Sequence, residues 1–202
     1  MSSPLAPVTA CSRVSPQIPV SGRIVVFSSG GRRVLMATGT LVSIDEYLTT
    51  VYRPDCDFVD GVIEERNPGE NDHADLQTAI ATYFRSRQKA LGIYVVVEQR
   101  VQMSPTRFRI PDVCIVVGGR PGEQIFRTPP FACIEILSPE DRLSRVSERV
   151  NDYLSFGVSY VWLVDPATRK AFRWTKEGMQ EVRELRTETP EIVVPVHSLF
   201  ED

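Results

Sequence analysis

The sequence predicts an α/β or α+β fold in which a mixed β-sheet is flanked by helices. Three observations carry this prediction. Helical and strand-like segments follow one another in the order helix, three strands, helix, strand. The strand-like segments are short apolar runs rich in valine and isoleucine, as expected for buried strands. The 202 residues, 42% of them hydrophobic, suffice for one domain with a sizeable core.

Residues 1–35 differ in character from the rest of the chain. They are rich in serine, proline and glycine, and only the stretch 24–27 could form a strand. We therefore expect a disordered N-terminal extension over 1–35 and a single domain over 36–202. Because the character changes at Met36, that methionine is a candidate translation start, which N-terminal sequencing of the native protein would test.

The first predicted elements are a short helix and a hairpin. The segment 41–48 fits a helix capped by Ser43, with Glu46 three residues later completing a capping box. The segment 58–66 fits a β-hairpin that turns at an Asp-Gly pair, a strong signal for a two-residue turn. Both predictions rest on local turn and cap chemistry.

Two longer helices are predicted from their caps and periodicity. The clearer one spans 72–91, with Asn71 or Asp72 as its N-cap and Gly92 at its end. The other spans 138–157, begins at its first serine or a neighbour, and ends at its own glycine. Further strands are predicted at 94–103, 109–117, 131–137, 160–166, 170–175 and 191–196.

Three polar side chains border the predicted core. His73 and Gln77 begin the face of the first long helix that carries its apolar residues. In the predicted strand 94–103, Gln99 points to the same side as the valines. These residues could support a site next to the core. For His73, a cap or an ordinary hydrogen-bonding role is the alternative.

Two acidic residues inside apolar strands are the most informative feature of the chain. If 109–117 pairs antiparallel with 131–137, the start of the first lies beside the end of the second, which brings Asp112 near Glu135. Two carboxylates this close both stay ionised only if a cation lies between them. Their oxygens suit Mg²⁺ or Mn²⁺, and such a metal could polarise a phosphoryl group and activate water. Those are the requirements for phosphodiester hydrolysis.

Other interpretations of these residues stay open. Each acid could pair with a nearby arginine such as Arg107 or Arg109, the ordinary arrangement at a strand end. For Glu135 this is less expected, because glutamate is seldom buried without a dedicated partner. The same strand pairing puts Cys114 opposite Cys133, so a Cys/Cys/acid zinc site is conceivable. Plain core thiols fit the spacing better.

Composition and charge exclude several classes of protein. The net charge is −3, and the excess of acid is larger beyond residue 35, because 1–35 contain four arginines and no acid. Such a body needs a local basic surface or a divalent cation to bind DNA. No apolar run approaches the ~20 residues of a membrane helix. The N-terminus lacks a secretory pattern and the four cysteines lack CxxC spacing, so we expect a cytoplasmic protein with free thiols.

Three arginines form a stripe on the second long helix. Arg142, Arg145 and Arg149 are spaced at i, i+3 and i+7 and border its apolar face. Arginines there can bury their stems and aim their guanidinium groups at a cleft. The alternative is a solvated face paired with neighbouring acids.

Several motifs between residues 36 and 202 occur in a recognisable order. They are Asp60-Gly61, His73, Pro111-Asp112-Val113, Glu135-Ile136-Leu137-Ser138-Pro139, and Tyr153 followed by Gly157-Val158 and Trp162-Leu163-Val164-Asp165-Pro166. Together they resemble the Uma family of endonuclease-like proteins, which belongs to the PD-(D/E)XK nuclease superfamily.

The resemblance implies a restriction-endonuclease-like core, a divalent metal (Mg²⁺ or Mn²⁺) and hydrolysis of phosphodiester bonds in DNA. It assigns Asp112 and Glu135 as the metal-binding acids. The superfamily's lysine two residues after the second acid is replaced by Leu137, and the family's relocated lysine matches Arg149. Arginine can stabilise developing negative charge but cannot act as a base, so this departure bears on activity.

The resemblance also implies supporting residues and two candidate functions. Asp57 falls where the family more often has glutamate, which implies a supporting position with His73, Gln77 and Gln99. The first candidate is a metal-dependent endonuclease in which Arg149 steadies the scissile phosphate. The second is a nuclease-fold module that no longer cleaves and serves in binding or assembly. A homodimer would suit an enzyme that cuts both strands.

Overall fold

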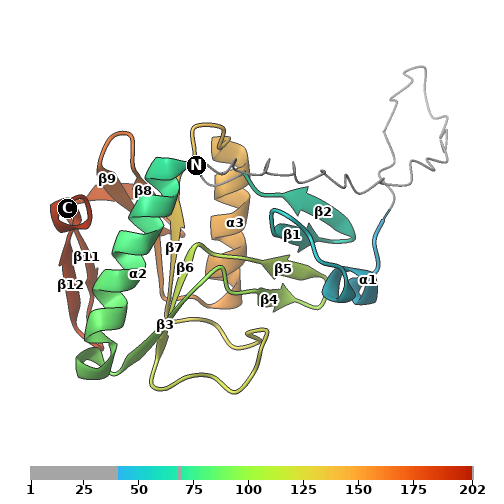
Figure 1. Ribbon diagram of the computed structural model, residues 1–202, viewed down its shortest axis with the longest axis horizontal. Coiled ribbons are helices and arrows are strands. Elements are labelled where there is room, and N and C mark those ends of the chain that lie inside the picture. The colour runs from blue at the N-terminus through green and yellow to red at the C-terminus, as the bar shows by residue number, and fades with distance from the viewer. Residues whose placement is uncertain (1–40, 68–69, 202) are drawn as a thin grey trace, which may run out of the picture. The chain divides into compact units, whose positions relative to one another are not determined.

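The computed structural model describes residues 41–67 and 70–201, and Figure 1 shows how their helices and strands are arranged. The expected extension 1–35, its strand-like stretch and Met36 lie outside the described residues. The helices are α1 (Ile44–Thr49), α2 (Asn71–Leu91), α3 (Leu143–Phe156) and the 3₁₀ helix η1 (Val196–Leu199). None of the described helices is long and apolar enough to cross a membrane.

The described strands form three sheets. The largest has the order β10 (Gly178–Val182), β9 (Lys170–Thr175), β8 (Tyr160–Asp165), β7 (Ala132–Ile136), β6 (Val113–Val117), β3 (Ile93–Val97). A second has the order β2 (Val62–Glu65), β1 (Cys56–Val59), β5 (Arg107–Arg109), β4 (Val101–Ser104). The third pairs β11 (Glu184–Thr187) with β12 (Ile192–Pro195). Neither β10 nor β11 was predicted from the sequence.

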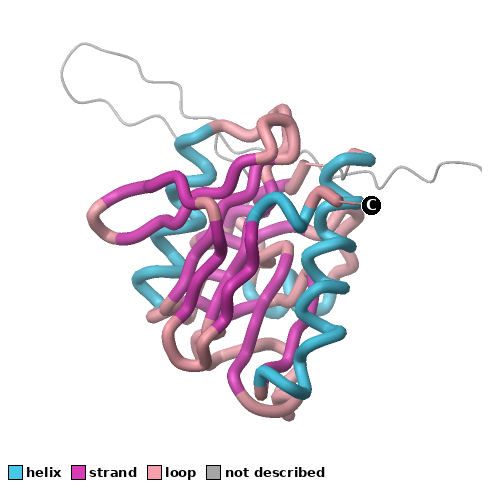
Figure 2. Tube along the Cα trace, turned by 90° about the vertical axis from the view of Figure 1, so that its left-hand side faces the viewer, coloured by secondary structure: helices cyan, strands magenta, loops and turns pink. Residues whose placement is uncertain are grey.

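The six-stranded sheet is mixed and lies between two helices, which confirms the predicted fold class (Figures 1 and 2). Strands β7 and β8 are parallel and are connected through α3, whereas their outer neighbours pair antiparallel. The helix α2 buries Ile80 and Phe84 against one face of this sheet, together with Ile134. The helix α3 buries Val150 against the opposite face, together with Cys133. Alternate side chains of β7 point to opposite faces of the sheet and therefore contribute to both cores.

The four-stranded sheet carries a smaller core with α1. Tyr47 of α1 stacks on Phe58 at 4.9 Å between ring centroids, and its hydroxyl donates to the carbonyl oxygen of Cys56 over 3.0 Å. The predicted cap is confirmed, since the Ser43 hydroxyl accepts the N–H of Glu46. The predicted hairpin is also confirmed as β1 and β2, with both turn residues at positive φ as a two-residue turn requires.

Two predicted strands are each broken in the middle. The segment 94–103 divides into β3 and β4 at Glu98, whose φ is +49°. The segment 109–117 divides into β5 and β6 at Pro111, which has no N–H for a strand ladder. Both breaks carry the chain from one sheet into the other, and the N–H of Glu98 donates to the carbonyl of Asp112 over 3.2 Å. Asp112 therefore lies at the junction of the two sheets.

The predicted starts of the two long helices were wrong, and their predicted ends are confirmed. The N-cap of α2 is Glu70 instead of Asn71 or Asp72. The helix α3 begins at Leu143, because residues 138–141 form a separate turn in which Ser138 N–H donates to the Asp141 carboxylate over 2.9 Å. The two glycines that follow α2 and α3 adopt φ values of +64° and +107°, a region that favours glycine.

Candidate active site

The two acids converge as the antiparallel pairing predicts. Strands β6 and β7 pair antiparallel with Val113 opposite Ile134, so Asp112 and Glu135 occupy the next rung. A hydrogen bond connects Asp112 to the residue after Glu135: the Ile136 N–H donates to Asp112 Oδ2 over 2.7 Å. Both acids are 1% exposed. The end of β6 that meets the second sheet therefore holds two buried carboxyl groups.

The Asp112 carboxylate is surrounded by donors from three elements. Arg66, which follows β2, donates to Oδ1, and His73 Nε2 of α2 lies 3.4 Å from Oδ2. Gln77 Nε2 donates to the backbone carbonyl of Asp112 over 3.0 Å. Burial opposes ionisation, but the contacts with His73 and Arg66 outweigh it and lower the pKa of Asp112. The same contact with Asp112 raises the pKa of His73.

Glu135 has a different set of partners, all from α3. The Tyr153 hydroxyl donates to Oε1 over 2.5 Å, and Arg149 Nε lies 3.3 Å from Oε2. Burial, with repulsion from Asp112, raises the pKa of Glu135 to about 7, although the positive charge of Arg149 acts in the opposite direction. The different surroundings of the two acids thus give them different pKa values: Asp112 is ionised, and Glu135 gains or loses a proton near neutral pH.

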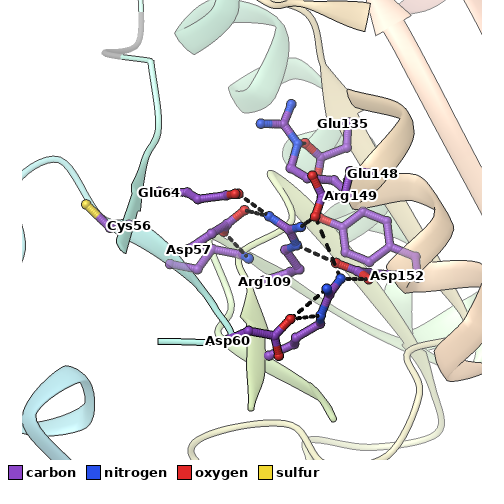
Figure 3. A network of polar contacts seen from close by, with 12 residues as sticks. Cys56, Asp57, Asp60, Glu64, Arg109, Glu135, Glu148, Arg149 and Asp152 are labelled. Atoms are coloured by element: carbon purple, nitrogen blue, oxygen red, sulfur yellow. Dashed lines mark hydrogen bonds and ion pairs between the residues drawn. The ribbon is translucent and has the colours of Figure 1, made fainter. Parts of the chain in front are cut away.

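The predicted supporting residue Asp57 belongs to a buried ion network, shown in Figure 3. Its Oδ2 accepts from Arg109 Nη1 over 3.0 Å, and its Oδ1 accepts from the Ile110 N–H over 3.0 Å. Arg109 also donates to Glu64 over 2.7 Å and to Asp152 over 2.8 Å. This one guanidinium therefore joins the hairpin β1–β2 to α3. Both oxygens of Asp57 are occupied by structural contacts.

The structure distinguishes among the alternatives that the sequence left open. Among the described residues, the arginines that contact the acid pair are Arg66 and Arg149, instead of Arg107 or Arg109. Arg66 was missed by the sequence reasoning, where only its place at the end of the predicted hairpin marked it. Gln99 donates to the carbonyl oxygens of two other residues, at 2.9 and 2.8 Å, and contacts neither acid.

Cys114 and Cys133 face one another as predicted and are buried free thiols. Burial and the contact with Cys114 raise the pKa of the Cys133 thiol. Within residues 41–67 and 70–201, no group of three His, Cys, Asp or Glu side chains is placed to hold a metal ion. Nothing in that part of the chain supports the zinc alternative.

A cavity of about 240 Å³ lies beside the acid pair. Four arginines line it: Arg66, Arg142, Arg145 and Arg149. Neither Asp112 nor Glu135 is among its lining residues. Because Arg66 and Arg149 contact the acids and also line the cavity, these two arginines lie between the acid pair and the cavity.

The donor set suits a hard divalent cation. Asp112 and Glu135 offer carboxylate oxygens, the ligands that Mg²⁺ and Mn²⁺ prefer. Two neighbouring carboxylates repel one another, and positive charge beside them offsets this repulsion. Arg66 and Arg149 supply that charge in this structure. A metal ion would exchange for the guanidinium contact at Asp112.

A mixed sheet between two helices, with paired acids at the start of one strand and the end of its neighbour, defines the restriction-endonuclease-like class. The Uma2 family, described as "Putative restriction endonuclease", matches residues 44–201, and the chain belongs to this family. The solved structure of a "putative nuclease belonging to DUF820" from Anabaena variabilis is similar, with a TM-score of 0.70 and 19% identity. The match covers 79% of this chain and 97% of that one. A comparison with curated proteins gave no match.

Proposed function

We propose that this protein is a metal-dependent endonuclease that hydrolyses phosphodiester bonds in DNA. One observation carries the proposal: Asp112 and Glu135, both 1% exposed, converge beside a cavity lined by four arginines. Family membership supports a nuclease, and the acid pair and the arginines are the groups that a polyanionic substrate requires.

Asp112 and Glu135 would hold the Mg²⁺ or Mn²⁺ ion. When bound, such a metal supplies a Lewis acid for the phosphoryl oxygens and lowers the pKa of a water molecule. Arg149 stabilises negative charge on the scissile phosphate, because its guanidinium lies beside Glu135 and lines the cavity. Leu137 stands at the superfamily's lysine position, so Arg149 is the positively charged group beside Glu135.

The supporting residues fix the position of Asp112 and of the elements around it. Gln77 holds the Asp112 carbonyl, and His73 contacts its carboxylate. Asp57 acts indirectly. It accepts hydrogen bonds from Arg109 and from the Ile110 N–H, and so positions the segment that leads to Asp112.

Nicking of supercoiled plasmid in Mn²⁺ tests the proposal. We expect nicking by the wild type, none after EDTA treatment, and a rate at least about 100-fold lower for Asp112→Asn. The exposed Asp45 of α1 provides a matched control, and Asp45→Asn should nick like the wild type. Circular dichroism would establish that Asp112→Asn is folded. Equal nicking rates for the wild type and Asp112→Asn, or no nicking by either, would reject the proposed endonuclease activity.

A second candidate is a nuclease-fold module that binds or assembles without cleaving. It is favoured by the arginine at the relocated lysine position and by the two guanidinium groups that cover the acids. Calorimetric titration separates the candidates, because an enzyme binds Mn²⁺ and loses it in Glu135→Gln. Absence of binding in the wild type favours the module.

The cellular setting belongs to the same proposal. We place the protein in the cytoplasm, since the described cysteines Cys56, Cys114 and Cys133 are free thiols. We expect a homodimer, which would let two sites reach both strands. Analytical ultracentrifugation with and without duplex DNA would test it.

A further inference from the structure

We propose that the cavity beside the acid pair binds a DNA backbone phosphate adjacent to the scissile one, through Arg142 and Arg145. The inference rests on the proposed function, since it names where the substrate's backbone is held. It assigns a role to two side chains that contact neither acid.

The charges of Arg142 and Arg145 are available to a ligand. Both side chains are exposed and line the cavity. Across residues 41–67 and 70–201, neither forms an ion pair, whereas Arg107 pairs with Asp60 over 2.7 Å and with Asp152 over 2.9 Å. Two arginines that face a cavity without an acidic partner are suited to an anion.

Several acids that share this cavity are already neutralised. Asp57 and Glu64 both bind Arg109, at 3.0 and 2.7 Å. Asp141 accepts the Ser138 N–H and lies 3.4 Å from Arg149. Pairing therefore offsets the negative charge of three of the five acids on the cavity wall, whereas Glu65 and Glu140, like Arg142 and Arg145, form no ion pair among the described residues.

The spacing along α3 connects these arginines to the acid pair. Arg142, Arg145 and Arg149 share one face at i, i+3 and i+7, and Arg149 contacts Glu135. Arg145 and Arg149 are about one turn apart, roughly 6 Å along the helix axis. A phosphate held by Arg142 and Arg145 is thus an immediate neighbour of the one at Glu135.

Fluorescence anisotropy of a labelled duplex in EDTA measures this binding without cleavage. The test compares the wild type with the double variant Arg142→Gln/Arg145→Gln over a range of salt concentrations. Loss of this one phosphate contact should reduce the slope of log K against log salt by about 0.9, and the affinity at 0.1 M salt by up to roughly 8-fold. The matched control is Arg120→Gln/Arg183→Gln, two exposed arginines outside the cavity, which should keep the wild-type slope.

The outcomes separate this site from the proposed function. An unchanged slope for the double variant, an equal reduction in the control, or a wild type that binds no duplex would overturn the phosphate site. If the slope falls as expected while the wild type never nicks plasmid in Mn²⁺, the phosphate site stands and the enzyme fails. If the wild type nicks plasmid and the double variant binds like it, the enzyme stands and this site is wrong.

Discussion

Replacing Arg109 with methionine should destabilise the protein far more than the same change at Arg107. Both arginines lie on β5 and both bind Asp152, at 2.8 and 2.9 Å. They differ in burial, since the Arg109 side chain is 1% exposed and that of Arg107 is 31% exposed. The comparison therefore sets a buried arginine against a partly exposed arginine of the same strand that shares its Asp152 partner.

The expected magnitude follows from what each change leaves behind. Without Arg109, the Asp57 carboxylate stays buried at 2% exposure with only the Ile110 N–H as a donor. Removing one partner of a buried ion pair costs about 3–5 kcal/mol of the free energy of unfolding. Arg107 takes part in partly exposed pairs, each of which contributes about 0–1 kcal/mol.

Urea unfolding measures the difference. With a slope of about 2 kcal/mol/M, the midpoint should fall by roughly 1.5–2.5 M for Arg109→Met and, with three partly exposed pairs lost, by no more than about 1.5 M for Arg107→Met. Adding Asp57→Asn to Arg109→Met should restore part of the loss, because the uncompensated charge is then gone. Similar midpoints for the two single variants would refute the reasoning, as would a double variant less stable than Arg109→Met.

Three further predictions concern the acid pair. Arg66→Gln should tighten Mn²⁺ binding by about tenfold in calorimetry, since a competing guanidinium leaves Asp112; unchanged affinity would show that the two do not compete. In the metal-free protein, Glu135 ionises at about 4.5 when unfolded and its pKa is about 7 when folded, so stability falls by about 3 kcal/mol as the pH rises between these values. Glu135→Gln should abolish this decline in urea unfolding at pH 5 and 8; a variant that keeps it would contradict the assignment. Tyr153→Phe removes the hydroxyl donor and should extend the decline above pH 7, whereas an identical pH profile would mean that this hydrogen bond does not affect Glu135.

Cap, turn and glycine residues correctly predicted the features that depend on a few neighbouring residues. The Ser43 cap, the hairpin turn and the glycine ends of α2 and α3 each depend on a few adjacent residues. The break at Pro111 carried a signal too, because proline interrupts a ladder, yet the apolar run around it favoured one continuous strand. The break at Glu98 carried none, since glutamate rarely adopts a positive φ and the tertiary bond to Asp112 accompanies it.

The candidate site was predictable where it depends on strand pairing. Alternation and antiparallel register brought Asp112 to Glu135. The partners of these acids depend on how distant segments meet: Arg66 is 46 residues from Asp112. Tyr153 was noted as part of a family motif, and only the structure assigns its hydroxyl to Glu135. Gln99 was misplaced because the strand expected to orient it ends earlier.

The crossover from β7 through α3 restricts how the length of this chain can vary. Glu135 and Tyr153, 18 residues apart, meet across it, with Arg149 between them in sequence. Inserting one residue in α3 ahead of Arg149 would turn that side chain by about 100° and shift it by roughly 1.5 Å. The exposed turn between β9 and β10 carries no such constraint. Insertions and deletions among homologous sequences should therefore gather in that turn and avoid the interval from Glu135 to Tyr153.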